Sequence, residues 1–411
     1  MKPVIVVAAF RREKALARLL NSIQSASYSF PVKLIISLDG GASPEVVRTA
    51  TEFDFRHGTV EVVRRTENIG LRRHIIWCGD KAEEYGSAIV LEDDLYVDPY
   101  FYDYAVNALQ FYRNETMVAG IALYAQKFNE CAGLPFEPIY NGSSGYFMQV
   151  ACSWGQAWTG DQWARFKDWY LNADENSVNN VGALPQYVKE WPESSWKKYF
   201  FAYIVEHNKY IYYPYITYST NCSDPGGSHV KDGSDVYQVP LGMACRPLEE
   251  FKFFPFDGGL AYYDSYMEPI NDEIFRGLGL DRRDLEVDLY GTKPLELLKK
   301  KKYALTSRDC KRYIRVFGAQ FRPMEKNLLF DLDEHDVSRI GDGKYIYLTR
   351  SDDVVGAGNP YFKLARYYSY IPFASRRFAK GCFLLMAREV SAKISRAIIF
   401  FIRRLKVYVC G

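Results

Sequence analysis

The sequence predicts an α/β protein built on a mostly parallel β-sheet. Through residues 1–97, short apolar runs alternate with stretches whose apolar residues recur at helical spacing. This alternation is typical of parallel strands joined by crossover helices. In such sheets ligands bind beside the carboxyl ends of the strands, so polar residues at those ends are the first candidates for a site.

Each predicted element has its own signal. The strands are runs rich in Val and Ile, and the first helix places Leu16, Leu19 and Ile23 on one face. The expected order is a strand at 3–9, a helix at 12–25, a strand at 32–38, a helix at 44–52, a strand at 59–64, a helix at 71–85 and a strand at 87–91.

Acidic residues follow two of these strands. Glu92, Asp93 and Asp94 end the last one, and Asp39 ends the second, where the glycines at 40–41 form a turn that lets the backbone approach a ligand. Buried carboxylates need a compensating cation, and Mg²⁺ or Mn²⁺ takes hard oxygen ligands of this kind. The alternative is a solvated strand end or a helix start, which acids also stabilise.

Composition indicates a globular protein of two or three domains. The chain has 411 residues, of which 48% are hydrophobic and 25% charged. Its eight Cys form no C-x-x-C pair, which disfavours a zinc site or a disulfide scaffold. No stretch reaches the roughly 18–20 apolar residues that span a bilayer, and the short apolar run at the N-terminus is unlike a secretory signal. A cytoplasmic protein is therefore expected.

Several motifs in the N-terminal half occur in one order. They are Val4–Ala9 with Arg11, Ser37-Leu38-Asp39-Gly40, Arg73-His74-Ile75-Ile76-Trp77 and Val90-Leu91-Glu92-Asp93-Asp94-Leu95. This pattern resembles the nucleotide-sugar-binding half of glycosyltransferases with the GT-A fold. The acidic run is most similar to that of the N-acetylglucosaminyltransferase I-like group.

A second set of motifs extends the resemblance to residue 235. It comprises Ser153-Trp154-Gly155-Gln156-Ala157-Trp158, Trp163, Trp196, Pro214, Thr220-Asn221 and Gly227-Ser228-His229. These motifs resemble those of bacterial family-two-like sugar transferases of surface-polysaccharide clusters.

The resemblance implies roles for residues that would bind the donor. Ala9, with the loop after the first strand, would meet the base and ribose, and Asp39 would accept a hydrogen bond from uracil or ribose. Arg11 and Arg73 would hold the diphosphate, a role that suits bidentate guanidinium groups. Asn68 belongs to an Asn-x-Gly turn that would open a helix beside the donor.

The resemblance also implies a metal site for Mn²⁺ or Mg²⁺. Asp94 would bind the metal directly, while Glu92 and Asp93 would bind the sugar, the ribose or a metal-bound water. His229, in a glycine-rich segment, is the second candidate ligand, although a loop histidine is equally often solvated. His74 would contact the nucleotide by its motif match, whereas a lone histidine on a helix is more often packed.

The acceptor side is less well defined. Trp154 and Trp158 would form a wall for the acceptor sugar, unless their indoles belong to the core. In the resembling families the catalytic base is an Asp directly after a Trp, and here that position is Lys197. Glu193 is the substitute and Asp161 the reserve. A relocated base, a retaining mechanism or loss of activity all stay open.

Four regions follow from these motifs. Residues 1–110 are the nucleotide-sugar-binding half, 111–240 the acceptor-binding half, and 241–355 an accessory region of unknown role. In that region helices are expected near 264–276 and 294–302, and strand-like alternation at 312–350 predicts a small sheet.

Residues 356–411 form a strongly basic tail. It holds eleven Lys or Arg and one acid, whereas the remainder holds 41 basic and 49 acidic residues. Apolar and basic residues alternate at helical spacing, which is typical of basic amphipathic helices on an anionic membrane surface. A basic helix packed on the acidic body is the alternative. Nucleic-acid binding is disfavoured because the body is acidic and shows no recognition motif.

The sequence thus predicts a metal-dependent hexosyl- or N-acetylhexosaminyltransferase. It would move a sugar from a nucleoside diphosphate donor, foremost a UDP-sugar, to a glycan or lipid-linked acceptor in polysaccharide or lipopolysaccharide synthesis, peripherally on the inner face of the cell membrane. The alternative is an inactive donor-binding or scaffolding subunit. A nucleotidyltransferase is disfavoured because the loop after the first strand has no glycine.

Overall fold

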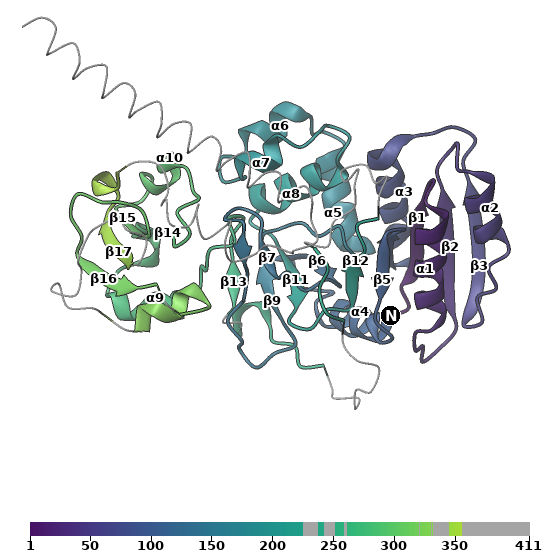
Figure 1. Ribbon diagram of the computed structural model, residues 1–411, viewed down its shortest axis with the longest axis horizontal. Coiled ribbons are helices and arrows are strands. Elements are labelled where there is room, and N and C mark those ends of the chain that lie inside the picture. The colour runs from purple at the N-terminus through teal and green to yellow at the C-terminus, as the bar shows by residue number, and fades with distance from the viewer. Residues whose placement is uncertain are drawn as a thin grey trace, which may run out of the picture.

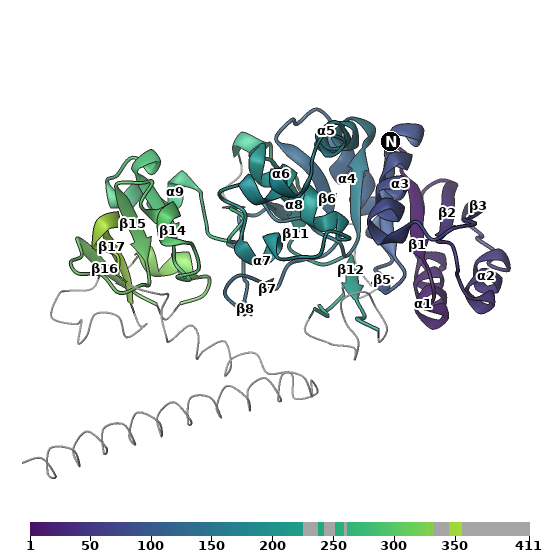
Figure 2. The same cartoon turned by 90° about the horizontal axis from the view of Figure 1, so that it is seen from above.

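The two largest β-sheets differ in size and lie along the long axis of the computed structural model (Figures 1 and 2). The structure describes residues 1–224, 237–241, 251–258, 261–319, 321–329, 331 and 345–355. The larger sheet holds the candidate site, and the smaller one follows it in the chain.

The larger sheet has nine strands. They are β1 (Val4–Ala9), β2 (Val32–Leu38), β3 (Gly58–Arg64), β4 (Ser87–Glu92), β6 (Val118–Ala122), β9 (Gly145–Met148), β10 (Gln156–Thr159), β11 (Tyr210–Pro214) and β13 (Tyr262–Tyr263). Their order is β13-β9-β11-β6-β10-β4-β1-β2-β3, and five of the eight neighbouring pairs are parallel. The predicted α/β class with a mostly parallel sheet is therefore confirmed.

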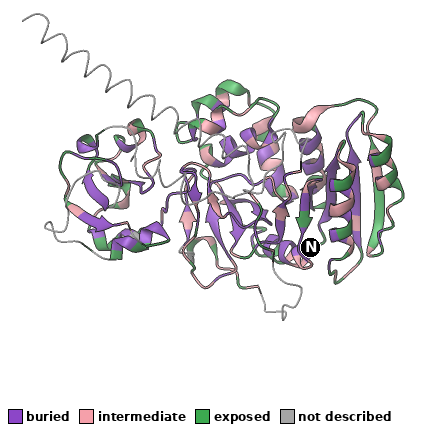
Figure 3. Cartoon of the chain, in the orientation of Figure 1, coloured by how far each residue is buried: buried purple, intermediate pink, exposed green. Residues whose placement is uncertain are grey.

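Helices cover both faces of this sheet (Figures 1 and 2). They are α1 (Glu13–Gln24), α2 (Pro44–Thr51), α3 (Gly70–Tyr85), α4 (Phe101–Phe111), α5 (Gly160–Tyr170), α6 (Glu175–Asn180), α7 (Gln186–Lys189) and α8 (Trp196–Glu206). Alternate residues of β1 join two different cores, because successive side chains of a strand point to opposite faces. The central strands are buried, whereas β3 at the sheet edge is exposed (Figure 3).

All seven elements predicted within residues 1–92 are present, with ends within one residue of the prediction. The signals were local. For example, α2 begins with Pro44 in its first turn, and the Ser43 side chain accepts a hydrogen bond from the Val46 N–H.

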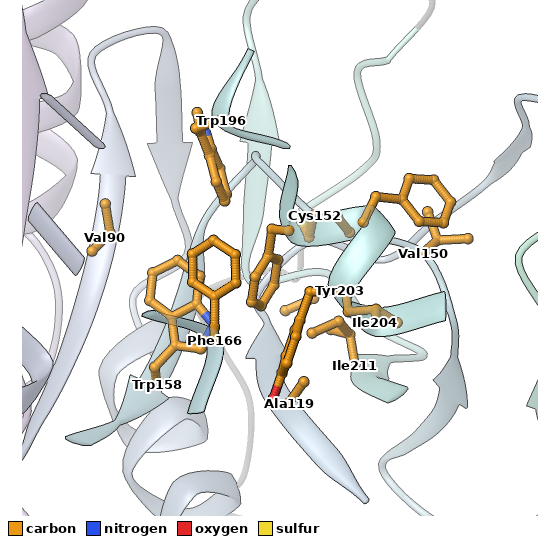
Figure 4. Close-up of a cluster of buried hydrophobic side chains, with 14 of the residues drawn as sticks. Val90, Ala119, Val150, Cys152, Trp158, Phe166, Trp196, Tyr203, Ile204 and Ile211 are labelled. Atoms are coloured by element: carbon orange, nitrogen blue, oxygen red, sulfur yellow. The ribbon is translucent and has the colours of Figure 1, made fainter. Parts of the chain in front are cut away.

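Large aromatic side chains fill the core between the sheet and helices α3, α5 and α8. Trp158, Phe166 and Trp196 lie in one cluster there (Figure 4). Two glycines make room for the indoles. A Cβ on Gly79 would lie 2.1 Å from the Trp163 ring, and one on Gly120 would lie 2.6 Å from Trp158 Nε1.

The smaller sheet confirms the strand-like pattern predicted within residues 312–350. Its strands are β14 (Leu285–Asp288), β15 (Tyr303–Thr306), β16 (Arg315–Gly318) and β17 (Tyr345–Arg350), in the order β14-β15-β17-β16. Its first two strands were not predicted. Short ladders join β5 (Leu95–Val97) to β12 (Ser219–Asn221) and β7 (Phe128–Asn129) to β8 (Leu134–Pro135). The 3₁₀ turns are η1 (Phe256–Gly258), η2 (Arg276–Leu278), η3 (Arg282–Asp284), η4 (Met324–Leu329) and η6 (Ser351–Asp353).

Three predictions for the accessory region were wrong in detail. The helix expected at 264–276 is only α9 (Asp272–Phe275), because Tyr263 and Pro269 form a β-bridge and Met267 has a positive φ of 61°. The helix expected at 294–302 is only α10 (Leu295–Leu298). The boundary at 240 is too early, since β13 pairs with β9 in the larger sheet.

In the part of the chain that the structure describes, no helix has the length and apolar character needed to cross a bilayer. The basic tail at 356–411 lies outside the described residues.

The backbone before α3 packs closely against the turn that follows β2. A Cβ on Gly40 would lie 2.0 Å from the carbonyl carbon of Glu67 and 2.4 Å from the Asn68 nitrogen. The sequence suggested that this glycine makes room for a ligand, but the segment before α3 fills that room.

We expect Gly40→Ala to destabilise the protein by about 3 kcal/mol, because the new methyl group meets backbone that has no space to give. Urea unfolding at neutral pH measures this loss. The matched control is Gly277→Ala, where a Cβ would meet no atom within 4 Å and stability should change little. Equal stability of the two variants would contradict this account of the turn.

Candidate active site

The acidic residues after β2 and β4 flank the end of β1. The Asp39 N–H donates to the Ala9 carbonyl and the Asp93 N–H donates to the Ala8 carbonyl, each at 3.1 Å. Because neighbouring strands lie about 4.8 Å apart, the two backbones are about 10 Å from each other. The structure thus brings the two predicted acidic positions together at one edge of the sheet.

Asp39 is buried, and its carboxylate is hydrogen-bonded to backbone N–H groups of the chain. Its carboxylate accepts hydrogen bonds from the N–H groups of Gly40 at 2.8 Å, Ile69 at 3.0 Å and Gly70 at 3.1 Å. The Asn68 side chain also accepts from Gly70 at 3.0 Å, so the predicted turn opens α3. Asp39 therefore fixes the start of that helix, and its contact with a nucleotide stays a prediction.

Arg12 is the cation of the acidic cluster, a role that sequence reasoning missed. Its guanidinium binds the Asp93 carboxylate, and Nη1 lies 3.1 Å from Asp94 Oδ2. Arg11, the predicted diphosphate residue, instead contacts the Gly41 carbonyl at 3.3 Å and stacks on the Phe10 ring. The sequence signal was the Arg-Arg pair itself, in which neighbouring side chains point in different directions.

Negative charge is in excess at this cluster. Burial and the charges of Asp94 and Asp93 raise the pKa of Glu92 to about 8, although Arg12 opposes this shift. Burial also raises the pKa of Asp93 to about 6 against the attraction of Arg12. Burial lowers the pKa of Arg12, but Asp93 and Asp94 outweigh it and the net pKa is raised. The site therefore suits a further cation.

Carboxylates of this kind are ligands for Mn²⁺ or Mg²⁺. Asp94, whose side chain is 17% exposed, and Glu92 have the right donor chemistry. Within the described ranges, however, no three His, Cys, Asp or Glu side chains are placed to hold a metal ion together. The second predicted ligand, His229, lies outside the described residues. The described residues thus fit part of a metal shell.

A second arginine borders the cluster. Arg18 on α1 binds the Asp224 carboxylate with both of its Nη atoms, one at 2.9 Å. Asp224 is held nearby because the Cys222 N–H donates to the Asp94 carbonyl at 2.8 Å, which continues the ladder between β12 and β5. Sequence reasoning also missed Arg18, which lay inside a predicted helix with no motif to mark it.

His74 is a packed residue. It is 4% exposed, and its Nε2 lies 2.8 Å from the Ser37 hydroxyl. Burial lowers its pKa to about 4 despite the attraction of Asp39. The packed alternative thus describes His74 in this structure, and its contact with a nucleotide stays a prediction. Arg73, beside it on α3, is exposed, and Ala9 is buried in the core next to the site.

Two acceptor-side predictions were wrong. Asp161 follows β10, which runs antiparallel to β4, so Thr159 pairs with Ser87 and Asp161 lies at the opposite sheet edge from Glu92. It cannot act as the base there. Trp158 is fully buried and cannot stack on a sugar.

Three other predicted residues lie nearer the acidic edge. Trp154 is half-buried, with its ring centroid 4.7 Å from that of Tyr124. Glu193 is 63% exposed and lies 3.6 Å from Arg72. Lys197 faces two indole rings and a carboxylate. It stands where the resembling families have their base, and a role for it in proton transfer stays a prediction.

No protein-family model and no curated protein matches the chain. Solved structures with weak similarity include two transferases and a pyrophosphorylase. S. aureus TarS 1–349 in complex with UDP-GlcNAc has 12% identity and a TM-score of 0.37 over 57% of this chain and 62% of that chain. Mannosyltransferase PcManGT from Pyrobaculum calidifontis, in complex with GDP-Man and Mn²⁺, has 10% identity and a TM-score of 0.30 over 53% and 58%.

The third is the nucleoside-diphosphate-sugar pyrophosphorylase from Vibrio cholerae RC9, with 14% identity and a TM-score of 0.34 over 53% of this chain and 95% of that chain. The chain thus spans less than two thirds of the two transferases named above. Similarity at this level carries no conclusion about the ligands or the reaction of this chain.

The buried state of His74 predicts a pH dependence of stability. Its pKa of about 4 lies below the ordinary 6.5, so the unfolded chain takes up a proton first as the pH falls. The contribution of His74 to the free energy of unfolding is fully present above pH 6.5 and is lost as the pH falls toward 4. The loss is up to about 3 kcal/mol.

Urea unfolding of wild type and His74→Gln between pH 7 and 4.5 measures this effect. The wild type should lose stability more steeply than the variant, because Gln does not titrate. Parallel curves would show that His74 takes up its proton equally in both states.

Proposed function

We propose that the chain is a glycosyltransferase that uses a nucleotide-sugar donor. The supporting observation is the convergence of Asp39 with residues 92–94 around the end of β1, with Arg12 and Arg18 beside them. A nucleoside diphosphate is an anion that paired arginines and a bound cation recognise together. The motif resemblance in residues 1–235 points to the same class of substrate.

Arg12 is suited to bind the diphosphate. Its guanidinium already contacts two carboxylates and can present its remaining N–H groups to phosphate oxygens. Asp94 is the residue we propose to hold Mn²⁺ or Mg²⁺, and Glu92 and Asp93 to bind the sugar or the ribose. When bound, such a metal neutralises the negative charge that develops on the departing diphosphate.

The acceptor is proposed to be a glycan or a lipid-linked saccharide. Residues 1–110 would bind the donor and residues 111–240 the acceptor, with Trp154 as part of the acceptor wall. A UDP-sugar is the first donor to test. The second candidate function is a donor-binding subunit without activity, which the Lys at position 197 favours.

Asp94→Asn should lower donor turnover at least about 100-fold, because it removes a charge from the proposed site of phosphate and metal binding. Release of nucleoside diphosphate from a panel of UDP- and GDP-sugars with Mn²⁺ measures this. Asp161→Asn is the matched control, since it makes the same change at the other edge of the sheet. Turnover that is unchanged in Asp94→Asn would refute the metal assignment.

Binding without turnover is the distinguishing result for the second candidate. If a nucleotide sugar with Mn²⁺ raises the melting temperature of the wild-type protein but no nucleoside diphosphate is released, the protein is a donor-binding subunit.

We further propose that residues 356–411 attach the protein to the anionic inner face of the cell membrane. Changing Lys393, Arg396, Arg403 and Arg404 to Gln should weaken binding to phosphatidylserine-containing vesicles on the order of 1,000-fold, because each cation contributes about 1 kcal/mol near the surface. Vesicle sedimentation measures this loss. Changing Lys299 and Lys300 to Gln is the control. Equal binding of both variants would show that the tail has another role.

A further inference from the structure

Three segments meet beside the acidic cluster. Strand β10 lies between β4 and β6 and is antiparallel to both, so β6 ends at the same sheet edge as β4, and β10 begins there. The segments after Ala122 and before Gln156 therefore lie at the edge that carries Glu92. The third segment is the start of α8, where the indole N–H of Trp196 faces the Glu92 carboxylate and lowers its pKa.

An ion pair lies among these segments. The Lys197 ammonium is 3.8 Å from Glu130 Oε1, and both side chains are 12% exposed. The same ammonium lies 5.1 Å from the ring centroids of Trp154 and of Trp191. Lys197 directly follows Trp196, which contacts Glu92. The Lys197–Glu130 ion pair is therefore next in the chain to a residue that contacts the acidic cluster.

The walls of this cluster are fixed by the backbone. The Trp154 carbonyl accepts a hydrogen bond from the Ser219 hydroxyl at 2.5 Å, and the Trp191 carbonyl accepts one from the Lys198 ammonium at 2.9 Å. Lys198 is itself buried. The backbone at both tryptophans is thus anchored beside Lys197, and the Trp154 ring is positioned by the rings of Tyr124 and Tyr237, whose centroids lie 4.7 and 4.8 Å away.

Few hydrogen bonds from the residues that the structure describes reach this ion pair. Among the described residues, Glu130 accepts only one long hydrogen bond, at 3.5 Å from Gln126 Nε2, and Lys197 donates none. A separation of 3.8 Å is too long for a hydrogen bond. Burying charged groups to this extent costs free energy unless their remaining donors and acceptors form hydrogen bonds. A ligand with several hydroxyl groups, such as a sugar, would satisfy both groups at once.

We propose that Glu130 is the catalytic base of the transfer, and that Lys197, Trp154 and Trp191 bind the acceptor sugar. This rests on the glycosyltransferase function proposed above. The acceptor hydroxyl gives its proton to the Glu130 carboxylate while its oxygen forms a bond to the anomeric carbon. The bond from that carbon to the diphosphate oxygen breaks, and its electron pair leaves with the nucleoside diphosphate.

Glu130 differs from Glu193, the base expected from the sequence. Glu193 is 63% exposed and paired with Arg72, whereas the Glu130 side chain is 12% exposed and lies 3.8 Å from Lys197, whose ammonium contacts the two indoles. A general base works in an enclosed site within hydrogen-bond reach of the hydroxyl. The sequence signal was weak, because Glu130 lies in a short hairpin between β7 and β8 with no motif around it.

The test compares Glu130→Gln with Glu137→Gln and Glu193→Gln. Glu137 belongs to the same hairpin region and pairs with Lys127 at 3.3 Å on the surface, so it is the matched control. The assay measures the release of UDP or GDP from UDP- and GDP-sugars with water as the acceptor. Calorimetry measures the affinity of each variant for the donor, and the melting temperature shows whether each variant is folded. Glu130→Gln should lower kcat at least about 100-fold with donor affinity unchanged, and the control, Glu137→Gln, should retain wild-type kcat. The kcat of Glu193→Gln tests the base expected from the sequence.

Glu130→Asp keeps the charge but withdraws the carboxylate, and it should retain more activity than Glu130→Gln while remaining at least about tenfold below wild type. It also tests the role if Glu130→Gln does not fold. Lys197→Met should raise the KM for a saccharide acceptor more than it lowers kcat, which a purely structural ion pair would not do.

Wild-type kcat in Glu130→Gln or in Glu130→Asp, or a large loss in Glu193→Gln alone, would overturn the assignment of Glu130 and leave the transferase function standing. A wild-type protein that neither binds nor turns over any donor in the panel would overturn the transferase function and this inference with it.

Discussion

The excess of negative charge beside the end of β1 is the constraint around which the site is built. Burial and the neighbouring carboxylates keep the pKa of Glu92 and that of Asp93 raised, even though Arg12 is paired with Asp93 and Asp94. An arrangement of this kind is unfavourable for a protein that binds nothing. A cation or a cation-bound ligand removes the imbalance, and the anionic diphosphate then has positive groups to meet.

The position of this cluster follows from the sheet, and for that reason the sequence could predict it. Strands β1, β2 and β4 have continuous apolar runs, and crossover helices between them force a parallel arrangement. The carboxyl ends of parallel neighbours meet at one edge, so Asp39 had to lie near Asp93 once the strands were recognised. Local periodicity was sufficient for this part of the fold.

Residues that depend on side-chain direction could not be predicted in this way. Periodicity does not say which of Arg11 and Arg12 turns toward the acids, and neither the strand-end position of Asp39 nor the motif resemblance showed that its carboxylate holds the start of α3. The same holds for Trp158, whose indole is enclosed only because Gly120 leaves space on a neighbouring strand. Such contacts join residues distant in sequence, and no spacing rule within one element encodes them.

The reversed strand β10 explains the largest errors and the position of the acceptor side. In a wholly parallel sheet the residues after every strand lie at the active edge, and Asp161, the reserve base, follows β10. Because β10 runs the other way, it is the residues before it, with Trp154, that reach the edge of Glu92. The loop after β6 with Glu130 and the start of α8 with Lys197 meet Trp154 there. One antiparallel strand thus gives the edge two chemically different sides: charged oxygens from β4, and aromatic rings with an ion pair from the second half of the sheet.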